Sequence, residues 1–520
     1  MSLLKSWYRL IERHEEYVVL ACIVLLLRVP SFFEPYWYGD EAIYLTIGNA
    51  IRSGLMLYRD IVDHKTPLIY FFAATGSQTL FKFLFAAWMT VCSMAFLWIL
   101  NKLKFVRSIA WTFTAIFVLL TTLPLLEGHI ANGELFVMGF VLLGIWVLLQ
   151  THLAKGALLE RFRETEPSSY NLDYFKMFLV GLLFGGAVLT KVPAVFDLAF
   201  PGGVIIVGLV SALLKKTWNV AWRYVVSGAL ILFGVILTVS LSAALFWLAG
   251  SLQPYIEFGW TYNFRYTQAF QVESTWPMVT WLFSGTGKLV LLGISGLMLL
   301  LPHSIVSKKL KPFLFWLGAA MYAALLSNRA YPHYFLQIIP PFLFVIAWWV
   351  RRKHLPEISV SAVLMAYLVL AVITLQLRPY PVFGYYVNFG QYITGFKTEQ
   401  QYRSWFNPLM TDTYAFAENI RETTNPSDRI FIWGTNPMLY ALSNRNPAGR
   451  FTVSFHIKDF NAKDESLAAV REHKVPVIVM MHDESDPFPE LQLELQQQYV
   501  LTNISPTMSM YRRISSTAFK

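Results

Sequence analysis

Near its start the chain carries Trp37-Tyr38-Gly39-Asp40-Glu41-Ala42-Ile43-Tyr44, a polar stretch between apolar segments at 17–33 and 82–100. A second polar run, Tyr58-Arg59-Asp60-Ile61-Val62-Asp63-His64-Lys65-Thr66-Pro67, follows before the chain becomes apolar again. Carboxylates beside membrane-length apolar segments are costly unless they are solvated or paired, so they are candidates for function. The flanking apolar segments decide the fold class, because they predict helices that cross a membrane.

The composition agrees with a membrane protein. Hydrophobic residues make up 56% of the 520 residues and charged residues only 14%, whereas soluble domains carry about 25% charged residues. The 17 Trp and 26 Tyr residues suit many membrane–water boundaries. A bilayer is spanned by roughly 20 apolar residues. Eleven segments approach that length, at 17–33, 82–100, 108–126, 135–152, 176–194, 198–214, 224–250, 285–302, 313–328, 335–351 and 358–377.

Basic residues set the predicted orientation, because short cytoplasmic loops are rich in Lys and Arg. With eleven spans and an inner N-terminus, the outer loops before the tail hold Arg52, Arg59, Lys65, Arg265 and Arg329. The inner segments hold far more basic residues: Lys5, Arg9, Arg13, Lys102, Lys104, Arg107, Lys155, Arg161, Arg163, Lys176, Lys215, Lys216, Arg223, Lys308, Lys309, Lys311, Arg351, Arg352 and Lys353.

The apolar segment 67–81 could count as a twelfth span, but that would turn Lys102, Lys104 and Arg107 outward. We therefore expect a half-buried or re-entrant helix at 67–81. In this topology four loops lie on the outer side: the loop with Asp40, the loop 127–134, the long loop 251–284 and the loop 327–334. The predicted location is the cytoplasmic (inner) membrane, with the polar chemistry outside.

The last part of the chain changes character. A helix is expected to end near 423, with strands at 429–434 and 475–480 and helices at 437–443 and 465–473. Strands that alternate with helices indicate a small α/β domain. The predicted organisation is a transmembrane domain at 1–379, with a catalytic first outer loop at 34–81, and an extracytoplasmic α/β domain at 380–520.

Several classes of protein and site are excluded. The net charge of +10 comes from residues in short loops between apolar segments, so we predict no nucleic-acid partner. Cys22 and Cys92 lie within apolar segments and predict neither a disulfide framework nor a metal site. The first apolar run is expected to be a retained anchor, because no small-residue cleavage site follows it. The glycines of 181–186 do not match a phosphate loop and indicate close helix packing.

Asp40 and Glu41 are the candidate catalytic residues. Transfer of a sugar from a phosphate-linked donor to a hydroxyl needs a base for the proton and stabilisation of the departing phosphate. Attack from the face opposite the leaving group would invert the anomeric centre. The structural alternative is that Asp40 caps a helix that begins near Ala42.

The other candidates divide by charge. Asp63, Asn132 and Glu134 could bind the acceptor or the sugar, although Glu134 could instead complement a helix dipole. A set of cations could hold a lipid-linked phosphate as it leaves, although each could instead extend to lipid headgroups. These cations are Lys65, Lys191, Arg265, Lys288, Arg329 and His333. His64 and two acids of this loop could also bind a divalent ion, but a lysine that holds phosphate is favoured, and we predict no metal and no cofactor.

At these residues the chain resembles the GT-C superfamily of polyprenyl-phosphate-sugar-dependent glycosyltransferases. The likeness is greatest to bacterial proteins similar to protein mannosyltransferases and to the aminoarabinose transferase of lipid A. It rests on Asp40-Glu41-Ala42 with Tyr44, Asp63-His64-Lys65-Thr66-Pro67, Asn132 to Glu134, Gly185 to Lys191 and Tyr331 to Phe335. The family often has Lys-Pro-Pro where this chain has Lys65-Thr66-Pro67. The resemblance implies that Asp40 is the catalytic acid or base with Glu41 assisting, that the donor is an undecaprenyl-phosphate sugar or similar, and that the acceptor is a lipid, glycan or protein on the outer face.

Two other activities remain as alternatives. A flippase or transporter of a lipid-linked saccharide should carry ionisable residues near the mid-plane and often two similar halves, and neither is evident. A polysaccharide polymerase or ligase would leave the Asp-Glu loop and the C-terminal domain less well explained. A scaffold would have no evident need for acids and cations on one face.

Overall fold

The computed structural model describes residues 15–158, 167–268 and 270–514. Lys5, Arg9, Arg13, Arg161 and Arg163, which enter the predicted orientation, lie outside the described residues. Contacts between residues divide the chain into two compact units. The membrane unit comprises 1–29, 85–244 and 263–382, and the mixed unit comprises 30–84, 245–262 and 383–520. The predicted boundary at 379/380 remains a prediction, because the mixed unit combines the C-terminal segment with parts of the first 262 residues.

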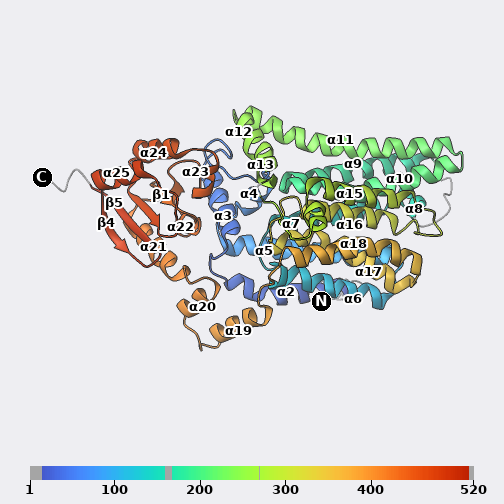
Figure 1. The fold of residues 1–520 in the computed structure, drawn as a ribbon, viewed down its shortest axis with the longest axis horizontal. Coiled ribbons are helices and arrows are strands. Elements are labelled where there is room, and N and C mark those ends of the chain that lie inside the picture. Colours follow the sequence, from blue (N-terminus) through green and yellow to red (C-terminus); the bar gives the residue numbers. More distant parts are fainter. Residues whose placement is uncertain (1–14, 159–166, 269, 515–520) are drawn as a thin grey trace, which may run out of the picture. The chain divides into compact units, whose positions relative to one another are not determined.

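The membrane unit is helical (Figure 1). Each predicted apolar segment coincides with a helix, which confirms the predicted polytopic α-helical fold. The helices are α2 (Glu15–Arg28), α5 (Gln78–Lys102), which begins in the mixed unit, α6 (Arg107–Thr122), α7 (Gly133–Leu148), α8 (His152–Leu158), α9 (Pro167–Thr190), η3 (Val192–Leu198), α10 (Ala199–Leu214), α11 (Trp218–Leu248), α13 (Tyr262–Gln268), α14 (Pro277–Leu282), α15 (Gly285–Leu297), α16 (Lys311–Ala324), η6 (Pro332–Ile338), α17 (Ile339–Arg352) and α18 (Leu355–Thr374).

Fewer than eleven of these helices meet a strict length criterion. Among the described residues, seven helices are long and apolar enough to cross a membrane, or eight if the bent pair α7 and α8 forms one span. The apolar helices at Arg107–Thr122 and Gly285–Leu300 are shorter. The number of eleven spans therefore stays a prediction. The segment 251–284, which we expected to be a loop, instead contains α12 (Leu252–Ile256), η4 (Glu257–Thr261), α13 and α14.

The glycines of α9 pack closely against α11, as the sequence predicts. A Cβ atom added to Gly181 would lie 2.2 Å from the backbone oxygen of Ile231, and one added to Gly234 would lie 2.6 Å from the backbone oxygen of Phe178. Neither position leaves room for a side chain, so the two helices touch through their backbones there.

The mixed unit contains the first loop and the C-terminal α/β segment. Its helices are α3 (Gly39–Arg52), α4 (Leu68–Ala73), α12, η4, α19 (Val382–Ile393), α20 (Glu399–Phe406), α21 (Met410–Thr423), α22 (Met438–Ser443), α23 (Ser454–Asp459), α24 (Lys463–Glu472) and α25 (Pro489–Gln498). The segment 67–81 holds only the six-residue α4 before α5 begins, which is too short to span a bilayer. The expectation that 67–81 does not form a full span is therefore confirmed.

The C-terminal segment forms a five-stranded sheet in the order β2-β1-β3-β5-β4. The strands are β1 (Arg429–Trp433), β2 (Asn446–Pro447), β3 (Val477–Met481), β4 (Tyr499–Ile504) and β5 (Met508–Arg513). β1 pairs in parallel with β2 and β3, and β5 pairs antiparallel with β3 and β4. The two predicted strands and the two predicted helices are confirmed as β1, β3, α22 and α24. The hairpin of β4 and β5 was not predicted.

Helices cover both faces of this sheet (Figure 1). Ile430 and Ile432 of β1 and Val477 of β3 share a buried core with residues of α21 and α22. Side chains alternate along a strand, so Phe431 and its register partner Ile478 face the opposite side, where Figure 1 shows α24 and α25.

The first loop is attached to the C-terminal segment by backbone contacts. Val62 pairs with Phe451 in a short parallel bridge, and the Val62 N–H donates to the carbonyl of Arg450 at 2.8 Å. In α3, the Thr46 hydroxyl donates to the carbonyl of Pro437 at 3.3 Å. These contacts hold α3 and the run 57–66 against the same domain.

Candidate active site

Asp40 and Glu41 lie in the first turn of α3. The helix begins at Gly39, its N-cap is Tyr38, and the cap makes no side-chain hydrogen bond. The expectation that Asp40 caps a helix starting near Ala42 is therefore wrong, because the helix begins earlier and includes Asp40. The position still suits an acid, since carboxylates are stabilised near helix N-termini.

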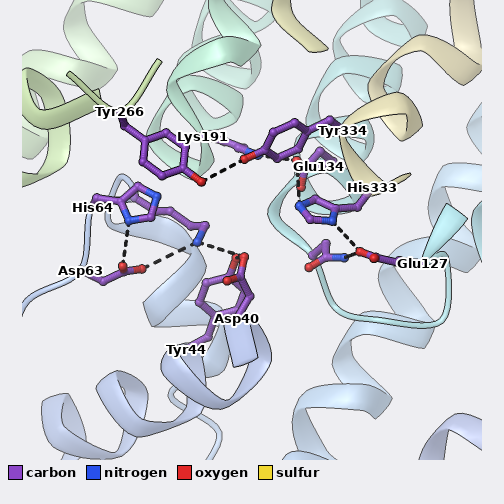
Figure 2. Close-up of polar contacts among 12 residues, drawn as sticks. Asp40, Tyr44, Asp63, His64, Glu127, Glu134, Lys191, Tyr266, His333 and Tyr334 are labelled. Carbon is purple, nitrogen blue, oxygen red and sulfur yellow. Dashed lines mark hydrogen bonds and ion pairs between the residues drawn. The ribbon is translucent and has the colours of Figure 1, made fainter. Parts of the chain in front are cut away.

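Asp40 is paired with Lys65 (Figure 2). The Lys65 ammonium lies 3.1 Å from Oδ2 of Asp40 and 3.8 Å from Oδ2 of Asp63. The Asp40 side chain is 33% exposed, whereas Lys65 is 8% exposed and Asp63 is fully buried. Tyr44 donates to Oδ2 of Asp40 at 3.3 Å, and its ring lies 4.9 Å from the Lys65 ammonium. The structure therefore brings the two predicted polar runs of the first loop together.

Two tyrosines fix the backbone and carboxylate beneath this pair. Tyr70 donates to Oδ2 of Asp63 at 2.6 Å and accepts from the Lys65 N–H at 3.1 Å. Tyr58, which has a φ of 68°, donates to the Lys65 carbonyl at 2.7 Å. Buried polar groups that are satisfied in this way hold their neighbours in one orientation. Lys65 therefore projects from a rigid segment.

Asp63 stays ionised despite its burial. Burial alone raises the pKa of its carboxyl, but the charge of Lys65 and the contact with His64 outweigh this effect and hold the pKa well below its ordinary range. Near neutral pH the group therefore carries a negative charge inside the fold, where it balances the ammonium of Lys65.

Glu41 faces a different environment from Asp40. Its Oε1 accepts from Nε2 of Gln78 at 2.7 Å and lies 3.5 Å from the Lys82 ammonium. Lys82 also pairs with Glu34 at 2.6 Å, and all three charged side chains are at most 3% exposed. Glu41 therefore belongs to a buried ionic group, while Asp40 is the accessible member of the pair.

A histidine of the C-terminal segment reaches the first loop. Nε2 of His456 lies 3.5 Å from Oδ1 of Asp63 and 3.3 Å from Nδ1 of His64. Burial lowers the pKa of His456 to about 3, although the Asp63 carboxylate acts in the opposite direction, so the imidazole is neutral near pH 7.

A second polar cluster lies within the membrane unit (Figure 2). Lys191, just after α9, pairs with Glu134 at the start of α7 and lies 4.3 Å from the ring centroid of Tyr334. His333 contacts Glu127 through Nδ1, and its Nε2 lies 3.9 Å from Glu134. Three of the predicted site residues, Glu134, Lys191 and His333, therefore meet here.

Glu127 anchors the cluster from an uncommon backbone conformation. Its φ is 61°, which is rare for residues other than glycine and often marks a functional site. Asn132 donates to its Oε2 at 3.5 Å. A cleft of about 530 Å³ opens beside Glu127, and its lining includes Tyr331, Arg378 and Tyr380.

The remaining predicted cations do not join this cluster. The Lys288 ammonium donates to the carbonyls of Leu325 and Leu326 and to the side chain of Asn328, at 2.9–3.2 Å. The guanidinium of Arg329 lies 4.1 Å from the ring centroid of Tyr266. Arg265, on α13, is exposed. The protein itself therefore supplies acceptors for the Lys288 ammonium.

Sequence reasoning missed four residues of the first-loop surroundings: Glu34, Tyr70, Lys82 and His456. Lys82 carried a usable signal, because it is a charged residue at the start of an apolar segment and such residues require a partner. His456 carried no such signal, because its place depends on how the C-terminal segment folds against the first loop.

No family model matches the chain, and no curated protein matches it significantly. Two solved structures of ArnT from Cupriavidus metallidurans are similar to it over 97% of this chain and 99% of theirs. The structure bound to undecaprenyl phosphate has a TM-score of 0.54 at 13% identity, and the apo structure has a TM-score of 0.57 at 14% identity.

A further match is weaker. The Archaeoglobus fulgidus oligosaccharyltransferase has a TM-score of 0.41 at 13% identity, over 89% of this chain and 67% of that one, which is too low to show a common fold. The ArnT structures, by contrast, match almost the whole chain. The chain therefore shares the fold of these ArnT structures, with apolar helices that fit a multi-pass membrane protein and a small C-terminal α/β segment. The fold predicted from the resemblance is confirmed.

Proposed function

We propose that the protein is an inverting glycosyltransferase, which moves a sugar from a polyprenyl-phosphate donor to an acceptor hydroxyl at the outer face of the cytoplasmic membrane. The observation that carries this proposal is the accessible carboxylate of Asp40, paired at 3.1 Å with the ammonium of Lys65. In this proposal the carboxylate is the base, and the neighbouring ammonium binds the phosphate of the donor. The shared fold with ArnT, one structure of which is bound to undecaprenyl phosphate, supports the choice of donor.

In the proposed reaction the acceptor hydroxyl attacks the anomeric carbon, and its proton passes to the Asp40 carboxylate. The bond from the anomeric carbon to the phosphate oxygen breaks, and the electron pair leaves with the phosphate. Lys65 stabilises the charge on that phosphate by a charge-assisted contact. Since attack and departure take place on opposite faces, the anomeric configuration inverts.

The contact between Asp40 and Lys65 also suggests how donor binding would activate the base. Without donor, the Lys65 ammonium is shared between Asp40 and Asp63. A bound phosphate competes for the ammonium and weakens its contact with Asp40, so donor binding makes the carboxylate a better proton acceptor. Glu41 has no direct part in the proton transfer, since its carboxylate is buried against Gln78 and Lys82. Its role is to hold the first turn of α3 in place.

The other predicted site residues support secondary roles in this proposal. Glu134, with Asn132 close by, orients the acceptor or the sugar, and Lys191 and His333 add positive charge for the lipid phosphate. Arg265 and Arg329 remain candidates for the same phosphate, and the structure gives Lys288 a role in holding the chain after α16.

The test is transfer of radiolabelled sugar from polyprenyl-phosphate donors to a crude envelope acceptor in proteoliposomes. A general base contributes about 10²–10⁴-fold to the rate, so Asp40→Asn should lose at least about 100-fold while donor binding persists. Asp60→Asn is the matched control, since Asp60 lies on the same loop but pairs with the exposed Arg59. Equal rates in Asp40→Asn and native protein would refute the assignment of the base. Movement of lipid-linked saccharide between leaflets without any transfer would favour a flippase instead.

A further inference from the structure

Three potential metal ligands meet where the first loop contacts the C-terminal segment. They are Oδ1 of Asp63, Nδ1 of His64 and Nε2 of His456. Asp63 is fully buried, and His456 and His64 are 1% and 12% exposed. All three residues belong to the mixed unit. Asp63 and His64 are neighbours in the first loop, and His456 follows 392 positions after His64. Together they direct one carboxylate and two imidazoles toward one point.

The spacing of these atoms fits a tetrahedral ion. The separations are 3.0 Å between His64 and Asp63, 3.3 Å between His64 and His456, and 3.5 Å between His456 and Asp63. Bonds of about 2.0–2.1 Å in a tetrahedral zinc site put neighbouring ligand atoms about 3.3 Å apart. The three atoms therefore outline one face of such a tetrahedron, and the fourth position is left for water or another small ligand.

Hydrogen bonding does not account for all the close contacts in this group, because three pairs of atoms share at most two protons. Nδ1 of His64 has one proton at most, so it can donate either to Asp63 or to His456. The described polar contacts of the buried His456 ring are made through Nε2, within the cluster. A cation would accept the lone pairs of both imidazoles and of the carboxylate at once.

The surroundings orient the carboxylate for this role. Tyr70 donates to the other oxygen of Asp63, Oδ2, and Lys65 lies nearest to that same oxygen. Such contacts are typical of the residues that hold metal ligands in place. Lys65 brings one positive charge, but Asp40 and Asp63 together bring two negative charges, so the group retains an excess negative charge that favours a cation.

We propose that Asp63, His64 and His456 bind one divalent transition-metal ion of the zinc class. Two imidazoles and one carboxylate suit zinc and its neighbours, whereas magnesium and calcium prefer oxygen ligands. The ion joins the first loop to the C-terminal domain, because two ligands lie on the loop and the third lies on α23. This proposal goes beyond the proposed function and does not depend on sugar transfer.

The first experiment measures metal in the full-length protein in detergent. After treatment with EDTA and dialysis against excess zinc, elemental analysis should give about one zinc per chain. Cobalt should give the visible absorption bands of a tetrahedral site. Zinc should also raise the midpoint of thermal unfolding of the native protein, because a ligand that binds only the folded state stabilises it.

Two histidine variants in the C-terminal domain, one at a proposed ligand and one at an exposed control position, test the site. His456→Ala should lose the zinc and the thermal shift, whereas His473→Ala, at an exposed histidine of the same domain, should keep both. Asp63→Asn should weaken zinc binding by at least about tenfold. If native protein takes up no zinc, or shows neither cobalt bands nor a thermal shift, the proposal is wrong even where a variant fails to fold. Equal zinc in native protein and His456→Ala would overturn it as well.

Sugar transfer is measured separately, so the two proposals can fail independently. Native protein that transfers sugar but binds no zinc would remove the metal site and leave the proposed function intact. Native protein that binds zinc through His456 but transfers no sugar would support the metal site and refute the proposed function.

Discussion

The ammonium of Lys65 lies 3.1 Å from Oδ2 of Asp40, although the two residues come from separate polar runs of the first loop. The Lys65 side chain is buried and pairs with the buried Asp63, while the Asp40 side chain is one-third exposed. The lysine is therefore the fixed partner and the aspartate the accessible one. In the proposed reaction, the donor phosphate would meet a cation whose position is set by the fold.

Lys65→Met should mainly weaken donor binding. A hydrogen bond to a charged group contributes about 1.5–3 kcal/mol, so the dissociation constant for the polyprenyl-phosphate donor should rise about 10- to 100-fold. Titration of the donor against purified protein, with the transfer rate at saturating donor, separates binding from chemistry. Lys65→Arg keeps the charge in a different shape and should recover part of the affinity. Unchanged donor affinity in Lys65→Met would exclude contact between this lysine and the phosphate.

Lys82→Met should destabilise the fold. It leaves the buried carboxylates of Glu34 and Glu41 without their cation, and removal of one partner from a buried ion pair costs about 3–5 kcal/mol. The midpoint of thermal unfolding in detergent should fall clearly. Lys215→Met is the control, because Lys215 is exposed and its loss should leave the midpoint almost unchanged. Similar midpoints for the two variants would contradict a structural role for Lys82.

Glu41→Gln distinguishes the two adjacent acids. Because Glu41 is buried against Gln78 and Lys82, its replacement should lower stability while the folded protein keeps more transfer activity than Asp40→Asn. The measurement is the transfer rate per folded molecule, with folding checked by size-exclusion chromatography. A loss as large as that of Asp40→Asn, in folded protein, would assign Glu41 a direct part in the reaction.

The sequence allowed the apolar helices and the first-loop motif to be predicted, because both depend on local pattern. The eleven apolar segments appear as helices, and Asp40 and Lys65 were singled out as polar residues beside apolar segments. The contact between them was not predictable, since it depends on the path of the chain between α3 and α4. The β4–β5 hairpin was missed for a different reason. Leu501 and Ile504 are exposed in β4, so its pattern lacks the apolar alternation that marks a half-buried strand.

Two elements of the site lay beyond the sequence altogether. His456 reaches Asp63 only because Val62 pairs with Phe451 and so brings the C-terminal segment to the loop. Asp40 lies inside α3 rather than at its cap, because the helix begins at Gly39. The place of His456 depends on tertiary packing, which the local sequence does not reveal.

Glu134 and Lys191 should behave as a coupled pair in the membrane unit. Each single variant, Glu134→Gln or Lys191→Met, leaves its partner's charge in a buried cluster with His333. The double variant removes both charges, so its loss of stability should be smaller than the sum of the single losses. Contacting pairs show coupling of about 0.5–3 kcal/mol. Midpoints of unfolding for the four proteins give the coupling, and strict additivity would show that the interaction between the two residues contributes nothing to stability.

Gly181→Ala should weaken the packing of α9 on α11. The added methyl would lie 2.2 Å from the backbone oxygen of Ile231, which cannot move without shifting α11. Overpacking of this kind costs about 1–3 kcal/mol, which exceeds the gain of about 1 kcal/mol that alanine brings to a helix. Gly293→Ala is the control, because Gly293 lies within α15 and nothing approaches its Cβ position within 4 Å. Thermal unfolding should show a lower midpoint for Gly181→Ala and an equal or higher one for Gly293→Ala. If both variants matched the native midpoint, the close approach of the two helices at Gly181 would not contribute to stability.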